Sequence, residues 1–284
     1  MKYTFKLSAV IISVVLLSVT INAYRGGEVE KTFDAKEVVR INTVSGDCIV
    51  KKGSSDKIDV RVTYDMHPDD VYEPEFRERS NSLRLNESIH GSCSGSSLWI
   101  ISVPDGTRIK FSSASGEFRA EDVSGEFEVS TASGDIEMIN CRGEFELSSA
   151  SGNVIAENCG GSFDMSTASG SVEAMEVKMD YASEFSSASG DVEVVLGSAC
   201  EQDLVVSTAS GRAVLNYNGN PLSGSFEFVC KARRGRVDSP IEFEWEETFE
   251  RHGQRYIARS FTTGSDSPEV LLETASGKVS LREN

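Results

Sequence analysis

The sequence predicts an all-β fold, a flattened parallel β-solenoid with 18-residue coils and capping strands at both ends. Three observations predict it. Ser-Gly pairs recur at nearly constant spacing, further glycines lie midway between them, and apolar and polar residues alternate after each glycine. Repetition at a fixed period is the signature of stacked repeats, and alternation with period two is typical of half-buried strands.

The Ser-Gly pairs define the coil. They end at Gly116, Gly134, Gly152, Gly170, Gly190 and Gly211, in steps of 18, 18, 18, 20 and 21, with further copies at 44–46 and 275–277. Gly125, Gly143 and Gly161 lie midway between the regular ones. One nonapeptide ends in Ser/Thr-Ala-Ser-Gly and the other in DVSG, NCRG or NCGG. Two unlike halves favour two sheets face to face, although the period alone would also fit a three-sided coil.

Alternation assigns the interior. The side chains expected to point inward are Phe118, Val129, Ile136, Met138, Phe145, Leu147, Val154, Phe163, Met165, Val172, Phe185, Val192, Val194 and Val206. We expect the alanines of the Ala-Ser-Gly corners to fill those corners: Ala114, Ala132, Ala150, Ala168, Ala188 and Ala209. The Ser and Thr columns before each glycine are expected to satisfy backbone groups in the turn. The alternative is a hydroxyl array that binds glycans or ice.

The chain divides into four parts in order. Residues 1–23 are a predicted signal peptide, 24–108 an N-terminal cap, 109–216 the regular coils, and 217–284 the C-terminal coils with a hairpin-like insertion. In the cap, residues 38–50 and 57–66 alternate, 67–97 are irregular and polar, and 98–103 return to the sheet. Near the far end, residues 225–261 depart from the repeat and 270–281 rejoin it.

The first residues predict export. Lys2 and Lys6 precede the uncharged run Leu7–Ala23, and polar residues follow from Tyr24. This is the pattern of a secretory signal peptide cleaved after Ala23. The rival interpretation is an uncleaved anchor, for which the run is short. We therefore expect a periplasmic, cell-surface or extracellular protein without a stable membrane span after cleavage.

The charge limits the partners. The net charge of −17 becomes −19 when Lys2 and Lys6 leave with the signal peptide. A chain this acidic is repelled by nucleic acid and by anionic lipid. An unknown envelope protein or glycan, or a cationic surface, remains as the expected partner.

The six cysteines all lie in the mature chain, and an even number permits disulfides in an oxidising compartment. Cys141 and Cys159 are separated by one full period of the repeat and take the same corner position in adjacent coils. Their Cα atoms are expected at about 5 Å, within disulfide range. Parallel Cβ directions disfavour the bridge torsion, so a disulfide and a ladder of buried thiols both stay open.

No catalytic group, metal site or cofactor is predicted. His67, His90 and His252 lie in different polar segments outside the regular coils, and their spacing does not indicate a nucleophile and base within reach. The acids are so numerous that no pair stands out as a glycosidase pair. The residue after each corner glycine drifts from Glu117 to Arg212, which a repeated calcium site would not tolerate.

The repeated motif is similar to a known family. Ser/Thr-Ala-Ser-Gly is followed by alternating acidic and apolar residues, after a Val-Pro-Asp-Gly entry at 103–106 and before a closing ETASGKVSL at 273–281. Together these resemble the bacterial putative-adhesin family of toastrack-like β-solenoid domains, over roughly 38–281. The resemblance implies the architecture and an envelope location, and supplies no catalytic residue.

One face carries the candidate binding residues. Stacking by one period places Glu126 beside Glu144 and aligns Glu128 with Glu146 and Asp164, all pointing outward. Such a ladder either keeps the protein soluble or binds a cationic surface or loosely held divalent ions. We expect an exported, non-catalytic, adhesin-like binding module of the bacterial envelope or surface. The alternatives are a structural or regulatory envelope scaffold with protein partners, and a polysaccharide-acting β-helix enzyme.

Overall fold

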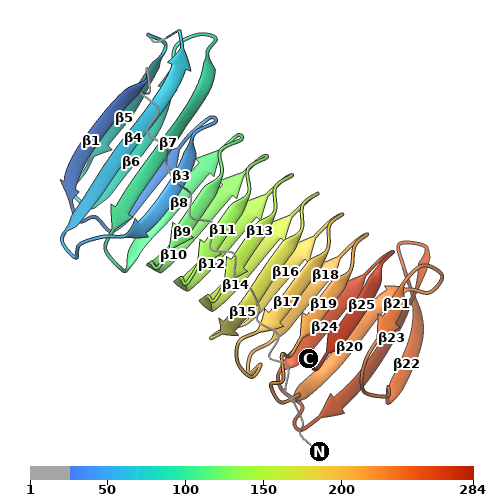
Figure 1. Cartoon of the computed structure of the whole chain (residues 1–284). Helices are drawn as coiled ribbons and strands as arrows, with labels where there is room; N and C mark the ends of the chain where they lie inside the picture. The colour runs from blue at the N-terminus through green and yellow to red at the C-terminus, as the bar shows by residue number, and fades with distance from the viewer. Residues whose placement is uncertain (1–25, 69) are drawn as a thin grey trace, which may run out of the picture.

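The computed structural model describes residues 26–68 and 70–284, so the predicted signal peptide lies outside the described residues. This part of the chain forms 25 strands and no helix. None of its segments is therefore a helix with the length and apolarity of a membrane span. Figure 1 shows a stack of narrow coils between two broader ends. The predicted all-β solenoid is confirmed.

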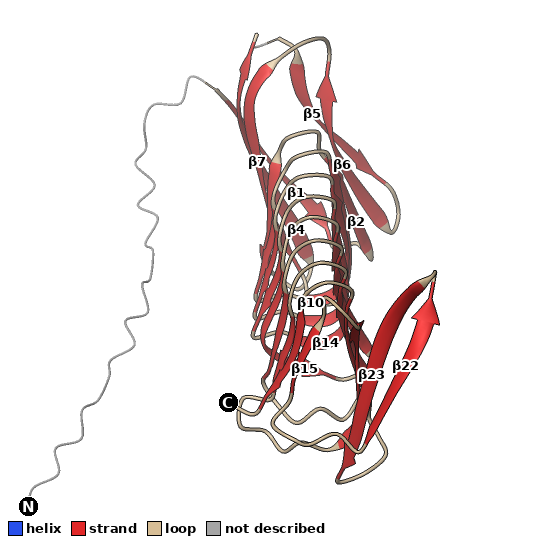
Figure 2. Ribbon diagram, turned by 90° about the vertical axis from the view of Figure 1, so that its right-hand side faces the viewer, coloured by secondary structure: helices blue, strands red, loops and turns tan. Residues whose placement is uncertain are grey.

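The regular coils contribute one strand to each of two facing sheets, which Figure 2 shows joined by corner loops. Sheet A contains β9 (Phe118–Glu121), β11 (Ile136–Ile139), β13 (Val154–Glu157), β15 (Val172–Met179), β17 (Val192–Leu196) and β19 (Ala213–Asn216). Sheet B contains β8 (Thr107–Ser113), β10 (Ser124–Thr131), β12 (Arg142–Ser149), β14 (Gly160–Thr167), β16 (Ser183–Ser187) and β18 (Leu204–Thr208). The coil therefore has two sides.

All these strands pair in parallel with the equivalent strand of the next coil. Phe127 aligns with Phe145 and then with Phe163, so each coil repeats the previous one after a single period of the sequence. The first longer coil accommodates its two extra residues between Met179 and Glu184, because its offset to the previous coil is 18 residues at Gly161 and Met179 but 20 at Asp164 and Glu184.

The N-terminal end widens both sheets with antiparallel strands. It contains β1 (Gly27–Asp34), β2 (Val38–Asn42), β3 (Asp47–Lys52), β4 (Lys57–His67), β5 (Tyr72–Glu78), β6 (Ser82–Ile89) and β7 (Ser94–Val103). The order β1-β4-β7-β3-β9 begins sheet A, and β5-β6-β2-β8 begins sheet B. The expectation that 67–97 is irregular is wrong. The segment holds β5, β6 and the start of β7, because pairing with neighbouring strands extends polar residues that lack the repeat pattern.

The C-terminal end contains β20 (Gly224–Lys231), β21 (Arg236–Asp238), β22 (Trp245–Arg251), β23 (Gln254–Thr263), β24 (Glu269–Thr274) and β25 (Lys278–Arg282). β22 and β23 form an antiparallel hairpin, and β23 pairs with β20. The coil formed by β24 and β25 lies between the β18–β19 coil and the β20–β21 coil. Spatial order is thus reversed here relative to chain order.

The interior between the two sheets is mainly apolar, and every side chain predicted to point inward is buried. Phe127, Phe145, Phe163 and Phe185 form a stacked column with ring centroids 5.4, 5.0 and 5.7 Å apart. Offset stacking of this kind adds to the free energy gained by burial. A core spread evenly along the stack leaves the outer faces free for charged side chains.

The corner before each glycine differs from the expectation for alanine. The alanines are exposed. The Ser or Thr that directly precedes each alanine is in most corners buried. Thr167 Oγ1, for example, donates to the Gly152 carbonyl at 2.9 Å and accepts from the Gly170 N–H at 3.2 Å. The prediction that the hydroxyl columns satisfy corner backbone groups is confirmed for this column. The second column is exposed: Ser115 Oγ donates to the Val44 carbonyl at 3.3 Å, whereas its other serines, Ser133, Ser151, Ser169, Ser189 and Ser210, form no side-chain hydrogen bond with a described residue. The buried polar turn occupies the interior of the corner, so the alanine methyl points out.

Candidate functional site

The predicted acidic residues lie together on the outer face of sheet B. Glu126 and Glu128 lie on β10, Glu144 and Glu146 on β12, and Asp164 on β14, all exposed. Glu126 is directly beside Glu144, and Glu128, Glu146 and Asp164 are in register. Adjacent parallel strands lie about 4.8 Å apart, so like charges are held close to one another.

Two cations on β8, which the sequence reasoning missed, meet this ladder. Arg108 forms an ion pair with Glu126, and Lys110 forms one with Glu128. Their strands are in register, Arg108 opposite Glu126 and Lys110 opposite Glu128. Counting one period back from each glutamate would have found them. The regular repeat therefore begins at β8, half a coil before the first regular corner glycine, Gly116.

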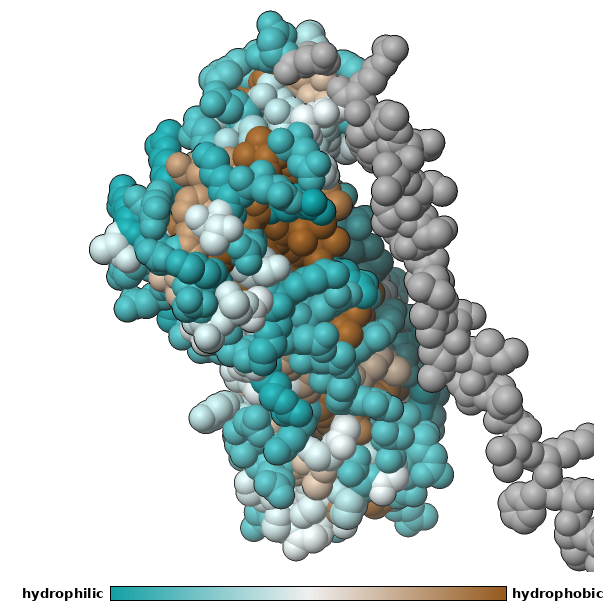
Figure 3. Space-filling view, turned by 60° about the vertical axis from the view of Figure 1, so that its left-hand side comes forward, coloured by the Kyte–Doolittle hydropathy of each residue, from teal (hydrophilic) through white to brown (hydrophobic). Residues whose placement is uncertain are grey.

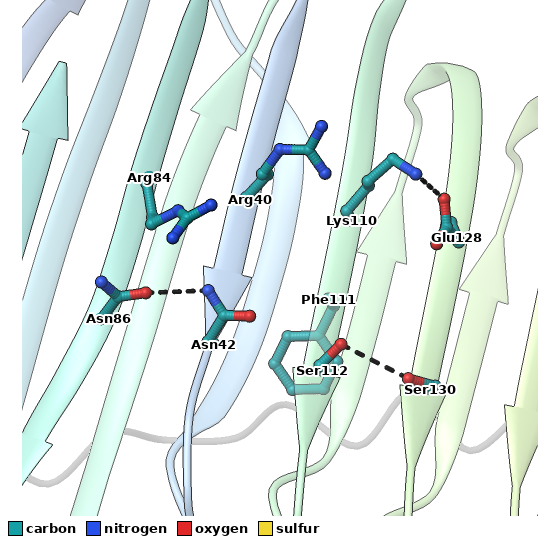
Figure 4. A pocket seen from close by; sticks show the side chains of 9 residues that line it. All are labelled: Arg40, Asn42, Arg84, Asn86, Lys110, Phe111, Ser112, Glu128 and Ser130. Carbon is teal, nitrogen blue, oxygen red and sulfur yellow. Dashed lines mark hydrogen bonds and ion pairs between the residues drawn. The ribbon is translucent and has the colours of Figure 1, made fainter. Parts of the chain in front are cut away.

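The row through Glu128 continues into a cluster of arginines. Lys110 is in register with Arg40 on β2, Arg40 with Arg84 on β6, and Arg84 with Arg77 on β5. Figure 4 shows Arg84, Arg40 and Lys110 projecting from neighbouring strands around a shallow depression of about 380 Å³. The sequence could not place them, because β2 and β6 precede the regular repeat and their register depends on the cap.

The row changes sign once along its length. From β5 to β16 it reads Arg77, Arg84, Arg40, Lys110, Glu128, Glu146, Asp164 and Glu184. We call these eight residues the charge row. Like charges directly opposite on neighbouring strands destabilise a sheet, and the row contains such contacts on both sides of the junction at Lys110 and Glu128.

Most charges in the row lack a partner of opposite sign. Among the described residues, Lys110 pairs with Glu128 and Arg77 with Glu75, whereas no ion pair joins Arg40, Arg84, Glu146, Asp164 or Glu184 to any side chain. Isolated surface ion pairs contribute little to folding. The fold therefore gains almost nothing from this arrangement.

Small polar side chains flank the charge row. Asn42 Nδ2 donates to Asn86 Oδ1 at 2.8 Å, and the Ser112 and Ser130 hydroxyls are 3.4 Å apart. Ser148, Ser166 and Ser186 continue this row on the following strands. Short side chains beside long charged ones leave the charges prominent on this face.

The rest of the described surface is also mainly polar. Figure 3 shows hydrophilic residues covering most of one face, with apolar residues visible between them. Large apolar side chains counted as exposed in the described chain are limited to Val44, Met175, Tyr181 and Trp245. They are dispersed, and the segregated charges of sheet B are the more organised feature.

Cys141 and Cys159 lie in adjacent coils as predicted, and both are free thiols in the structure. The Cys141 backbone N–H donates to Cys159 Sγ at 3.4 Å. The hydrogen bond with the Cys141 thiol, together with burial, raises the pKa of the Cys159 thiol. The arrangement keeps Cys159 protonated and unreactive.

The histidines lie in separate places. His67 ends β4, His90 follows β6, and His252 lies in the turn between β22 and β23. Within residues 26–68 and 70–284, no group of three or more His, Cys, Asp and Glu side chains is placed to hold a metal ion.

Solved structures that resemble the chain include the following three. A putative cell adhesion protein from Clostridium sporogenes ATCC 15579 is 14% identical, covers 92% of this chain and 100% of its own, and has a TM-score of 0.34. A putative adhesin from Bacteroides fragilis NCTC 9343 is 14% identical over 90% of this chain and 97% of its own, with a TM-score of 0.49. A putative adhesin from Parabacteroides distasonis ATCC 8503 is 11% identical over 92% and 98%, with a TM-score of 0.41.

The sequence itself gives the decisive match. No curated protein matches the chain significantly. The model of one family, described as Toastrack DUF4097, matches residues 75–282, which span all the regular coils, the C-terminal end, and the N-terminal end from within β5 onward. The chain therefore belongs to the Toastrack DUF4097 family.

Proposed function

We propose that this protein is an exported, non-catalytic, adhesin-like binding module of the bacterial cell envelope or surface, and that the outer face of sheet B is its binding surface. The observation that carries the proposal is the charge row, whose members are mostly exposed and mostly without an ion-pair partner. Repulsion within such a row lowers stability slightly. A face that binds an oppositely charged surface explains why the repulsion is kept.

The test compares two variants with equal charge changes. The first replaces Glu126, Glu128, Glu144 and Glu146 with Gln. The control replaces four acids of sheet A with Gln: Glu137, Glu157, Glu173 and Glu193. As in the first variant, two of the four acids have an ion-pair partner and two have none among the described residues.

Binding of the purified proteins to whole cells and to envelope extract is measured. We expect the sheet B variant to lose binding and the sheet A variant to keep it. Equal binding by both would reduce the acidic ladder to a solubility device. Cell fractionation of the natural host tests export, and a cytoplasmic protein would contradict the proposal.

A further inference from the structure

The charge row is complementary to itself when reversed. Its four cationic positions are followed by four acidic ones on successive strands of sheet B. A two-fold axis that runs parallel to the strands, midway between two facing sheets and over the gap between β8 and β10, places each cation of one copy over an acid of the other. Two-fold interfaces are of this kind, in which residue i meets residue j and j meets i.

We propose that the outer face of sheet B pairs with the same face of a second copy of this chain, in antiparallel orientation. Arg40 then faces Glu146 of the other copy, Arg84 faces Asp164, and Arg77 faces Glu184. Lys110 and Glu128, already paired within one chain, meet their counterparts at the axis. This inference rests on the proposed function, because it names the cationic surface that the acidic ladder meets.

Unpaired charge on both halves favours this partner. Arg40 and Arg84 form no ion pair or side-chain hydrogen bond with another described residue, and neither do Glu146, Asp164 and Glu184. An acidic glycan would use the arginines and leave the acids unexplained. A cationic surface would use the acids and leave the arginines unexplained. A second copy uses both sets at once.

The shape of the molecule permits the approach. The face from β5 to β16 is about 34 Å long at the strand spacing of about 4.8 Å and about 17 Å wide for short strands. Two such faces together bury an area at the low end of the range for specific association. The C-terminal β22–β23 hairpin stands out from the stack on the sheet B side in Figure 2. Strand order places it beyond the end of the partner's face, so it does not obstruct pairing.

Twist predicts which pairs matter most. Each sheet twists in a fixed direction, so two facing rows diverge away from the axis. Arg40 and Glu146 lie one strand beyond the central charges, whereas Arg77 and Glu184 lie three strands beyond. Reversal of charge at Arg40 should therefore weaken association more than reversal at Arg77.

The experiment uses charge swaps and sedimentation velocity on the purified protein over a range of concentrations. We expect Arg40→Glu with Arg84→Glu, and separately Glu146→Arg with Asp164→Arg, to weaken self-association roughly tenfold or more, since like charges then face each other. Mixing the two double variants, or combining all four changes in one chain, should restore it. Raised ionic strength should weaken association of the unmodified protein.

Several results would overturn the pairing. The first is an unmodified protein that stays monomeric at every concentration. The second is a protein with all four charge changes that does not regain self-association. The third is an equal loss of self-association on charge reversal at Arg40 and at Arg77. Binding of polygalacturonate by the monomer, lost in Arg40→Gln with Arg84→Gln, would assign the arginines to an acidic glycan instead. If a charge-reversed protein fails to fold, the corresponding neutral variant takes its place in the sedimentation experiment. That variant is Arg40→Gln with Arg84→Gln, or Glu146→Gln with Asp164→Gln.

The two proposals fail separately. Loss of envelope binding in the sheet B glutamine variant without any self-association would support the binding module and reject the pairing. Self-association that follows the charge swaps, with envelope binding unchanged, would support the pairing and reject the envelope partner.

Discussion

Thr167 links two consecutive glycine corners. Its hydroxyl donates to the Gly152 carbonyl of the preceding coil at 2.9 Å and accepts from the Gly170 N–H of its own coil at 3.2 Å. Thr131, Ser149, Ser187 and Thr208 make the same two bonds in their coils. Each bond satisfies a backbone group that the tight turn removes from the sheet ladder.

We expect Thr167→Val to lower the free energy of unfolding by about 1–3 kcal/mol, because two buried backbone groups lose their partner. Thr167→Ser is the control, since Ser149 and Ser187 already make both bonds. Urea unfolding followed by circular dichroism measures the difference. Equal stability of the Val and Ser variants would show that the hydroxyl is dispensable.

Gly152 is required for a different reason, the close approach of coils. A Cβ atom at this position would lie 1.9 Å from the Gly134 carbonyl oxygen. Gly152→Ala forces the coils apart, and we expect it to lower stability by about 3 kcal/mol, the upper end for overpacking in a tightly packed region. Ser151→Ala, at an exposed neighbour, should change thermal stability very little. A Gly152→Ala protein as stable as the Ser151→Ala control contradicts the predicted steric conflict.

Two acids in one column should respond oppositely to pH. Partial burial, with the carboxylates of Asp47 and Asp135, raises the pKa of Glu117. The hydrogen bond from Arg212 lowers the pKa of Asp191. The folded state therefore binds a proton on Glu117 more tightly than the unfolded state does, and a proton on Asp191 less tightly.

At neutral pH, Glu117→Gln should raise the free energy of unfolding by a few tenths of a kcal/mol, because an unfavourable charge is removed. That gain should shrink as the pH falls through the raised pKa of Glu117. Asp191→Asn should lower stability at neutral pH, and this loss should fade as the pH falls below the ordinary Asp pKa of about 3.9. Urea unfolding across pH measures both, and parallel pH profiles would contradict the assignment.

The cysteine pair is expected to stay reduced. Cys141 and Cys159 are buried thiols, and a disulfide would require a torsion that equivalent positions in adjacent coils do not favour. Alkylation followed by mass spectrometry without reductant should label both only after unfolding. The partly exposed Cys93 should be labelled in the native protein. A protein mass two hydrogens below that of the reduced chain, with neither Cys141 nor Cys159 labelled after unfolding, would instead establish a disulfide between them.

The repeat made the coils predictable from sequence, because its period and alternation directly reflect strand stacking. Phe145 and Val154 are buried as the pattern requires. The corner alanines were misassigned because small apolar residues do not reveal which side of a turn they face. Hydrogen bonding decides that, and it brings the Thr167 hydroxyl inward.

The candidate site was predictable only in part. Glu126, Glu128, Glu144 and Glu146 follow the repeat, so their alignment could be counted. Arg40 aligns with Lys110 although β3 to β7 lie between them in the chain, and that register depends on how the cap strands pair. No local periodicity encodes it, so only the structure reveals the cationic half of the row.

The position of the last coil constrains how the protein can be made. β24 and β25 lie between the β18–β19 coil and the β20–β21 coil, although they emerge after β20 to β23 during synthesis or export. The stack can grow in chain order only as far as β19. The inward edge of β20 stays unpaired until β24 arrives. Folding of this end therefore depends on synthesis of residues 269–282, and a polypeptide that stops short of residue 269 presents two open sheet edges that invite association with other chains.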